Sequence, residues 1–325
     1  MKITPPKLIR SRYSTEQIAD FSDNGVILAV TSERNATIRT YELIQNGKRT
    51  PLTNIANDRP VALSPKGKPF QRPSLMPGRQ GGPPVRVGPL GVNAVWSPSV
   101  AGSRYLRRYY EDGSYLIAAP MGEGDHLSHK LGRTKDGKFV EELITIKDFQ
   151  GILERTSDDA LWLMSRKPGK PNEKNILLTR YHKMGTRTYP LPDNNTVVNR
   201  LGEGNGVIAA GVTNLKAARG EQIITYANGK WTILPLPEGQ LSARLTKVFD
   251  NGWILGECEG KDQEPTLTVL WKDRTPIILN DLPGWPINGL SSGVMGASRS
   301  ADIYVRNSIA TTFGSDEYYL IHLRE

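Results

Sequence analysis

The chain has one cysteine, no long apolar run and almost no helical periodicity. With Cys258 alone among 325 residues, no intramolecular disulfide is possible, so the fold does not depend on oxidation. No stretch of about 18 apolar residues is present, which argues against a membrane-spanning helix. Residues 1–17 lack the apolar centre of a secretory signal. A cytoplasmic location is therefore the default expectation, although an exported protein whose signal had been removed would look the same.

Catalytic motifs are absent as well. The sequence contains no Gly-x-Ser-x-Gly, no Walker sequence and no dinucleotide fingerprint. Glu257 and Glu259 flank Cys258, and neighbouring carboxylates raise the pKa of a thiol, which argues against a reactive cysteine. No cofactor is predicted.

What the chain does contain is a repeated turn, in which Asp-Asn-Gly or a looser version of it precedes an apolar run. The steps between successive copies are 42, 46, 46, 47, 46 and 50 residues. A period in the forties that is built of strands and tight turns is typical of propeller blades. The anchor residues of the seven copies are Gly25, Gly67, Gly113, Asp159, Gly206, Gly252 and Asp302.

The clearest unit spans residues 241–282. It predicts four strands, at about residues 243–249, 253–258, 266–271 and 275–279, with tight turns after the first and the third. The longer polar connections then lie together at the opposite end of the strands. Function on a rigid scaffold usually sits on such loops, so we expect the site at that end.

Over residues 199–290 the repeat reads Asn-Gly-x-Ile-x-Gly, a polar loop, an apolar Leu-Trp strand, a turn and a final Ile-Leu strand. This pattern resembles the short repeats of bacterial HAF-repeat and TolB-like propellers. The resemblance implies an all-β fold and says little about activity. We predict one domain over residues 1–325, a seven-bladed β-propeller, with six blades and a long insertion as the alternative.

The two chain ends predict how such a ring closes. The last repeat reaches its third strand at residues 318–323 and then stops. Residues near Lys7–Arg10 can supply the missing fourth strand, which would satisfy the hydrogen bonds of the open edge.

The second repeat is irregular and strongly basic. Residues 71–90 are rich in Pro, Gly and Arg, which argues against a central strand and for an insertion. The whole chain carries a net charge of +9, and no acidic residue occurs between Arg59 and Tyr110. Arginine binds phosphate and carboxylate bidentately, so this region is predicted to dock an anionic partner. A solvated, mobile insertion without a partner is the alternative explanation of the same composition. The predicted partner-binding residues here are Arg72, Arg79, Arg86, Arg104, Tyr105, Arg107 and Arg108.

Two further candidates lie in predicted connections. Trp285 stands between two blades and is the best aromatic candidate for a ligand contact. Asp125, His126 and His129 are weak candidates for a metal site, because His-x-x-His in a loop can supply two imidazoles. A solvated polar loop explains the second cluster equally simply.

These observations favour a non-catalytic binding or scaffold protein that docks a protein or anionic partner through its loops and its second repeat. A place in a larger assembly fits the same features, and an anionic polymer is a possible ligand. Nucleic acid is disfavoured because no recognition module is present. The alternative is a propeller enzyme, a lyase or hydrolase that acts on an anionic polymer or glycan.

Overall fold

The computed structural model describes most of the chain, and its residues form two compact units. Unit 1 comprises Met1–Ser14 and Gln150–Glu325, and unit 2 comprises Thr15–Phe149. Each unit is described by itself. The described residues are 2–3, 7–9, 16–32, 39–46, 48–53, 61–71, 88–89, 104–121, 128–135, 138–155, 159–167, 175–216, 220–261, 266–286, 293–308 and 316–324.

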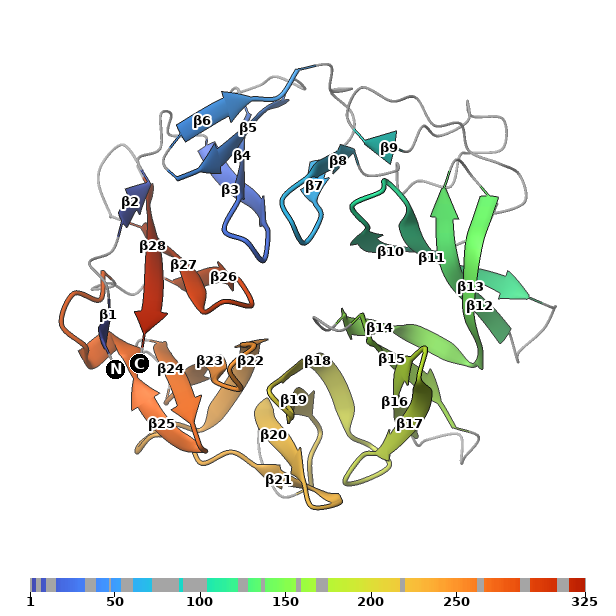
Figure 1. Cartoon of the computed structure of the whole chain (residues 1–325). Coiled ribbons are helices and arrows are strands. Elements are labelled where there is room, and N and C mark those ends of the chain that lie inside the picture. The colour runs from blue at the N-terminus through green and yellow to red at the C-terminus, as the bar shows by residue number, and fades with distance from the viewer. Residues whose placement is uncertain are drawn as a thin grey trace. The chain divides into compact units, whose positions relative to one another are not determined.

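Unit 1 contains three four-stranded antiparallel sheets whose strands pair in the order of the sequence (Figure 1). The predicted unit at residues 241–282 is confirmed as the third of them. The first sheet is β14 (Phe149–Arg155), β15 (Leu161–Arg166), β16 (Ile176–His182) and β17 (Gly185–Pro190). The second is β18 (Val197–Gly204), β19 (Val207–Thr213), β20 (Gln222–Ala227) and β21 (Lys230–Ile233). The third is β22 (Ser242–Val248), β23 (Ile254–Glu259), β24 (Leu267–Lys272) and β25 (Thr275–Ile278), followed by the short 3-10 helix η2 (Leu279–Asp281).

The last sheet of unit 1 joins the two ends of the chain. Strands β26 (Gly293–Ala297), β27 (Asp302–Ser308) and β28 (Asp316–Arg324) continue the pattern, and β28 pairs with β1 (Lys2–Ile3) and β2 (Lys7–Ile9). The residues of β2 lie opposite Leu320 to Tyr318 in antiparallel register. The predicted pairing of the N-terminal segment with the last strand is therefore confirmed, and β1 adds a second contact that the sequence did not reveal.

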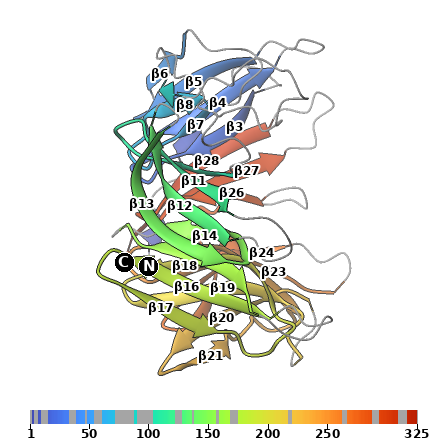
Figure 2. The ribbon, with the colours of Figure 1, turned by 90° about the vertical axis from the view of Figure 1, so that its right-hand side faces the viewer.

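Unit 2 contains two four-stranded sheets and one smaller sheet. In Figure 2 the long strands β12 and β13 stand out as a curved green pair. The four-stranded sheets are β3 (Glu16–Phe21), β4 (Ile27–Ser32), β5 (Arg39–Gln45) and β6 (Lys48–Pro51), and β10 (Arg104–Tyr109), β11 (Tyr115–Met121), β12 (Ser128–Lys135) and β13 (Lys138–Lys147). The second repeat gives three short strands, β7 (Val61–Leu63), β8 (Pro69–Gln71) and β9 (Gly88–Pro89). Most of the predicted insertion at 71–90 lies outside the described residues.

The repeated turns need a left-handed backbone, and the anchors supply it. The five glycine anchors have φ between 75° and 87°, and Asp159 has φ 64°. In the last copy Ala301 takes this conformation, with φ 67°, one residue before the predicted Asp302. Glycine and short polar residues tolerate positive φ, so the turns that contain them could be recognised in the sequence. Alanine rarely adopts this conformation, so Ala301 could not be recognised as a turn residue.

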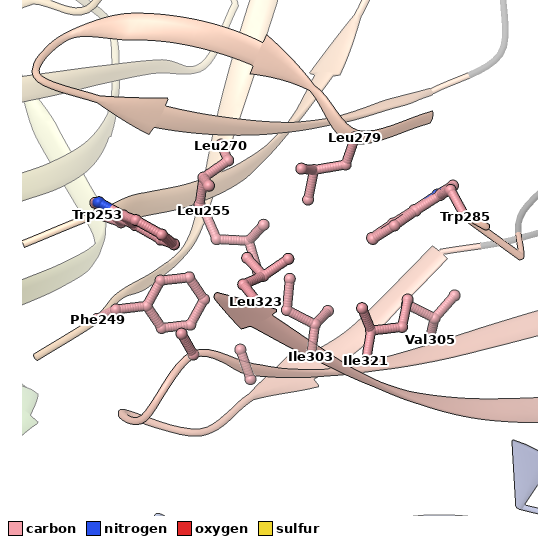
Figure 3. Packing of buried hydrophobic residues seen from close by; sticks show 12 residues of the cluster. Phe249, Trp253, Leu255, Leu270, Leu279, Trp285, Ile303, Val305, Ile321 and Leu323 are labelled. Carbon is pink, nitrogen blue, oxygen red and sulfur yellow. The ribbon is translucent and has the colours of Figure 1, made fainter. Parts of the chain in front are cut away.

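The core of unit 1 lies between neighbouring sheets. One cluster joins the third sheet to the last one, and there Leu255, Leu270 and Ile303 are fully buried (Figure 3). Another joins the second and third sheets through Ala209, Ile223 and further apolar side chains. Apolar residues thus cover both faces of the third sheet, which packs against a neighbouring sheet on each side.

Candidate functional site

The same pair of positions carries an arginine in three neighbouring sheets of unit 1. On the second strand of each sheet, the residue three positions after Ile208, Ile254 or Ile303 pairs with a residue of the first strand. These Ile residues follow the left-handed turn residue by two positions, so the pairs are equivalent in the repeat. We call these pairs the loop-end rung, because they lie toward the strand ends that the longer connections join. They are Arg200 opposite Gly211, Arg244 opposite Glu257, and Gly293 opposite Arg306.

The three arginines differ in exposure. Arg200 is exposed, and the structure gives it no hydrogen bond or ion pair with any described residue. The side chain of Arg244 is 53% exposed, while its partner Glu257 is 7% exposed. Arg306 is half-buried. The rung therefore presents at least two guanidinium groups to solvent from adjacent sheets.

Glu257 holds Arg244 and ties two sheets together. Its Oε2 accepts a hydrogen bond from Nη2 of Arg244, and its Oε1 accepts one from the backbone N–H of Val294 on β26, at 3.2 Å. The same oxygen lies against Gly293, where an added Cβ would be in ordinary van der Waals contact with it at 3.4 Å. The hydrogen bond and the charge of Glu257 raise the pKa of Arg244, so its guanidinium stays protonated.

A second carboxylate, Glu221, lies beside the same arginine. The backbone carbonyl of Glu221 accepts the N–H of Ala243 at 2.8 Å, which joins the second sheet to β22. Its Oε1 is buried, has no hydrogen-bond partner in the described structure, and fills the space over Gly211, where a Cβ would lie 3.0 Å away.

Such an arrangement can bind anions. A guanidinium offers five N–H donors in a planar fork that matches a carboxylate or phosphate. Arg200 has all of its donors available, whereas Arg244 shares one nitrogen with Glu257. Of the two, Arg244 is held in place by Glu257 before a ligand arrives, which lowers the side-chain entropy lost on binding.

Comparison with known proteins supports the fold. No family model matches the chain, and no curated protein sequence matches it either. Among solved structures, the β-propeller domain of the Trilobed protease from Pyrococcus furiosus has a TM-score of 0.57 and 11% identity, over 98% of this chain and 94% of that one. An oligogalacturonate lyase in complex with manganese has a TM-score of 0.56 and 12% identity, over 100% of this chain and 98% of that one. These likenesses show a β-propeller fold.

A third similar structure is much longer than this chain. Prolyl oligopeptidase B from Galerina marginata has a TM-score of 0.59 and 12% identity, and the chain spans about half of its length, 48%. TolB from Acinetobacter baumannii is matched with a TM-score of 0.37, which carries no argument. The propeller part of the resemblance inferred from the sequence is thus confirmed, and a particular TolB-like or HAF-repeat family stays a prediction.

Of the arginines predicted to bind a partner, one falls on the equivalent rung of unit 2. Arg104 on β10 lies opposite Ala118, three residues after Tyr115, which follows the left-handed Gly113 by two positions. Tyr105 lies opposite Ile117 in the same strand pair. Arg107 and Arg108 stand further along β10, where its register shifts. Arg72, Arg79 and Arg86 lie outside the described residues, so their role stays a prediction.

The other predicted site residues are not brought together. Trp285 is 6% exposed and packs in the core cluster near Leu279, Val305 and Ile321 (Figure 3). That position explains the ring as a core residue, and a ligand contact by Trp285 stays a prediction. His129 is buried on β12, with its ring 5.5 Å from that of Phe149. Its proposed companions Asp125 and His126 lie outside the described residues.

Three simpler expectations can also be compared with the described part of the chain. No group of three His, Cys, Asp or Glu side chains within it could hold a metal ion. None of its helices has the length and apolar character needed to cross a membrane. Cys258 is buried, and burial, rather than its acidic neighbours, raises the pKa of its thiol to about 12.

Sequence reasoning missed Arg200, Arg244 and Arg306 as a group. Each stands alone in a strand, with no local motif around it. The available signal was the spacing from the repeated turn, because Arg306 and Glu257 both stand five residues after the left-handed turn residue. Arg200 and Arg244 precede the turn at different spacings. The bulge in β22 lies between Arg244 and the turn, whereas the bulge in β18 lies beyond Arg200, so spacing alone does not align them.

Proposed function

We propose that the chain binds an anionic polymer at the loop-end rung of unit 1. The observation that carries the proposal is the recurrence of an arginine on the same rung of three neighbouring sheets. A single surface arginine does not indicate a binding site. Arginines at equivalent positions in neighbouring sheets form a row of positive charges, which can contact successive negative groups of a polymer. Arg200 and Arg244 are the exposed members and the expected contacts.

Close packing of the sheets supports this role. A Cβ on Gly211 would lie 3.1 Å from the Cβ of Leu245, and one on Gly202 would lie 2.7 Å from the side chain of Val248. The first strands β18 and β22 therefore approach each other closely, so Arg200 and Arg244 stand on adjacent strands of neighbouring sheets. A ligand that contacts both gains affinity because the second contact is intramolecular.

The direct test is a binding titration with polygalacturonate and with a neutral polysaccharide of similar length. The wild-type protein should bind the anionic polymer, with an affinity that falls as salt is raised, and should ignore the neutral one. Combining Arg200→Gln and Arg244→Gln should weaken binding at least ~10-fold, since each charge-assisted hydrogen bond contributes about 1.5–3 kcal/mol. Arg187→Gln is the matched control, because Arg187 is exposed on the outer strand β17. Equal losses from both sets of changes would contradict the proposal.

A second candidate function is cleavage of that polymer. The specific observation that favours it is the half-buried carboxylate of Glu221 close to the guanidinium of Arg244. Carboxylates in such positions serve as general acids and bases. The likeness over almost the whole of both chains to an oligogalacturonate lyase supports an enzyme at least as well as an inert scaffold.

The two modes of cleavage leave different products. A hydrolase adds water across the glycosidic bond and produces a new reducing end. A lyase eliminates across that bond and leaves a carbon–carbon double bond in one product, which absorbs in the ultraviolet. Incubation with polygalacturonate should produce one of these signals and Glu221→Gln should remove it, whereas binding without either product would leave a binding module.

The second repeat, in unit 2, carries a separate proposal. We propose Arg72, Arg79 and Arg86 as anion contacts of their own, because the region from Arg59 to Tyr110 contains no acidic residue. Replacing the three by Ala should weaken polymer binding without lowering the stability of the sheets. Unchanged affinity would exclude these three arginines as anion contacts.

We also propose that the chain forms one seven-bladed ring over residues 1–325, closed by the N-terminal strands. The pairing of β2 with β28 supports it. Deletion of residues 1–14 should then lower the cooperativity and the midpoint of unfolding of the whole chain. Loss confined to unit 1 would instead indicate two separate domains.

A further inference from the structure

The rung of unit 1 has no strong excess of positive charge. Arg200, Arg244 and Arg306 contribute three positive charges, and the three carboxylates that act on the Arg244 guanidinium, Glu221, Glu257 and Glu259, contribute three negative ones. The positive and negative charges of the group therefore balance. Sites for phosphate chains look different, because they gather Lys and Arg without acidic neighbours.

The carboxylates lie beside Arg244, so they decide how this arginine responds to a negatively charged ligand. Glu257 is bonded to Arg244 itself, and Glu221 lies close enough to stabilise the charge of the same guanidinium. A ligand anion that approaches Arg244 thus meets a guanidinium that already has a counter-charge. Like charges repel strongly at such short range near a protein surface, so every additional ligand charge at this place is unfavourable.

The polar groups around the arginines add a second requirement. Glu259 is exposed and lies close enough to Arg244 to stabilise its charge, and carboxylate oxygens are best satisfied by O–H or N–H groups of a ligand. Asn199, an exposed residue at the bulge of β18, and Thr246, at the bulge of β22, place neutral amide and hydroxyl groups on the first strands. Bulges aim side chains out of the regular pattern and are frequent beside binding sites.

We propose that the polymer recognised here is a carboxylate-bearing glycan with about one negative charge per sugar, and that Glu257 makes the site selective against densely charged polyanions. The inference rests on the proposed function and adds the class of ligand to it. A sugar acid supplies one planar carboxylate for the fork of Arg200 and several hydroxyl donors for the oxygens and amides around it. A phosphate chain supplies charge without donors, and an acidic polypeptide supplies carboxylates on flexible side chains without hydroxyls.

The experiment is a comparison of three probes of similar length on the intact chain: polygalacturonate, polyphosphate and poly-glutamate. The wild-type protein should bind polygalacturonate about 10-fold or more tightly than either of the others at the same ionic strength. This ranking needs no variant, so it remains decisive even if a substituted protein fails to fold. Equal or tighter binding of polyphosphate would overturn the inference, and so would equal or tighter binding of poly-glutamate.

Glu257→Gln then tests the selectivity itself. It keeps the shape of the side chain and removes the negative charge, so the affinity for polyphosphate should rise by about 10-fold while that for polygalacturonate changes less. Asp273→Asn is the control, because it removes one negative charge from an exposed turn of the same sheet. An equal rise in both variants would mean that only the net charge of the protein matters, and would overturn the role of Glu257.

The proposed function and the class of ligand can be tested separately. If Arg200→Gln with Arg244→Gln leaves the binding of every probe unchanged, the loop-end rung is not the site and the proposed function is wrong. If those changes abolish binding but the three probes rank in another order, the site is right and the class of ligand is wrong.

Discussion

The two ends of the sheets in unit 1 use arginine in opposite ways. At the end of the tight turns, Arg299 is 5% exposed and donates to Oδ1 of Asp250 and to the backbone carbonyl of Glu203, both at 2.8 Å. Arg180 donates to the carboxylate of Glu203 at 2.8 Å. At the loop end, Arg200 is exposed and has no bond to a described residue.

The same contrast holds for the bonds that each arginine makes between sheets. Arg274, in a turn of the third sheet, donates to the hydroxyls of Thr225 and Thr232 at 2.7 Å and to the carbonyl of Ile233 at 2.8 Å, all in the second sheet. Turn-end arginines thus connect neighbouring sheets through acceptors within the protein. At the loop end, Arg200 makes no bond to a described residue and Arg244 donates to Glu257 within its own sheet, so these two arginines do not connect neighbouring sheets directly.

The largest expected effect is the loss of Arg299. Arg299→Gln removes a buried charge that bridges three successive sheets, so the free energy of unfolding should fall by about 2–3 kcal/mol. Urea unfolding measures the change. Labelling of Cys258 gives a local reading in unit 1, because a buried thiol with a pKa of about 12 reacts only after the core opens.

Its control is Arg187→Gln. Arg187 lies on the outer strand over the ring of Tyr189, 5.1 Å from the centroid, and is otherwise exposed. This change should cost about 0.5–1 kcal/mol. If the two variants lost the same stability, the division between the ends of the sheets would not hold.

Arg274→Gln should have an intermediate effect. Its three donated bonds are partly exposed, so the expected loss is about 1 kcal/mol. Polymer affinity should stay within about twofold of wild type, because the residue lies away from the rung. A loss of affinity without a loss of stability would place a binding role at the turn end as well.

The sequence predicted the scaffold more fully than the site, for a physical reason. The turn residues Gly25, Gly113 and Gly252 were found because positive φ restricts the choice of residue. The strands of the third sheet could be placed to within a residue or two, because their apolar runs are bounded by such turns. Ala301 shows the limit, since its φ of 67° is imposed by the surrounding sheets and not by its own preference.

The site depends on register, which has no such local signature. Whether Arg244 lies opposite Glu257 is decided by a bulge at Thr246, and the bulge in β18 occurs at Asn199, at a different level. One inserted residue changes which side chains face each other across a strand pair. The basic second repeat attracted attention in the sequence by composition, while the arginines of unit 1 are scattered and became a group only through pairing.

Stability should barely change when the loop-end arginines are removed. Arg200→Gln with Arg244→Gln removes one exposed side chain and the half-exposed partner of the buried Glu257, whose carboxylate can still accept a hydrogen bond from the new amide. The free energy of unfolding should therefore fall by only about 1 kcal/mol. Urea unfolding compared with Arg299→Gln makes the contrast quantitative. A larger loss than that of Arg299→Gln would show that the rung is structural after all, and any loss of polymer affinity would then be indirect.

Arg200→Lys should give the smallest change and the most specific information. The substitution keeps the charge and removes the planar fork, so the protein should unfold as the wild type does. If Arg200 binds a carboxylate through two parallel hydrogen bonds, affinity for polygalacturonate should fall about 3- to 10-fold while its dependence on salt stays the same. If Arg200 contributes charge alone, the lysine variant should bind as well as the wild type, and Arg200→Gln should then show both a lower affinity and a weaker salt dependence. Titrations of the three proteins at several salt concentrations distinguish the two cases, because long-range charge is screened by salt and hydrogen-bond geometry is not.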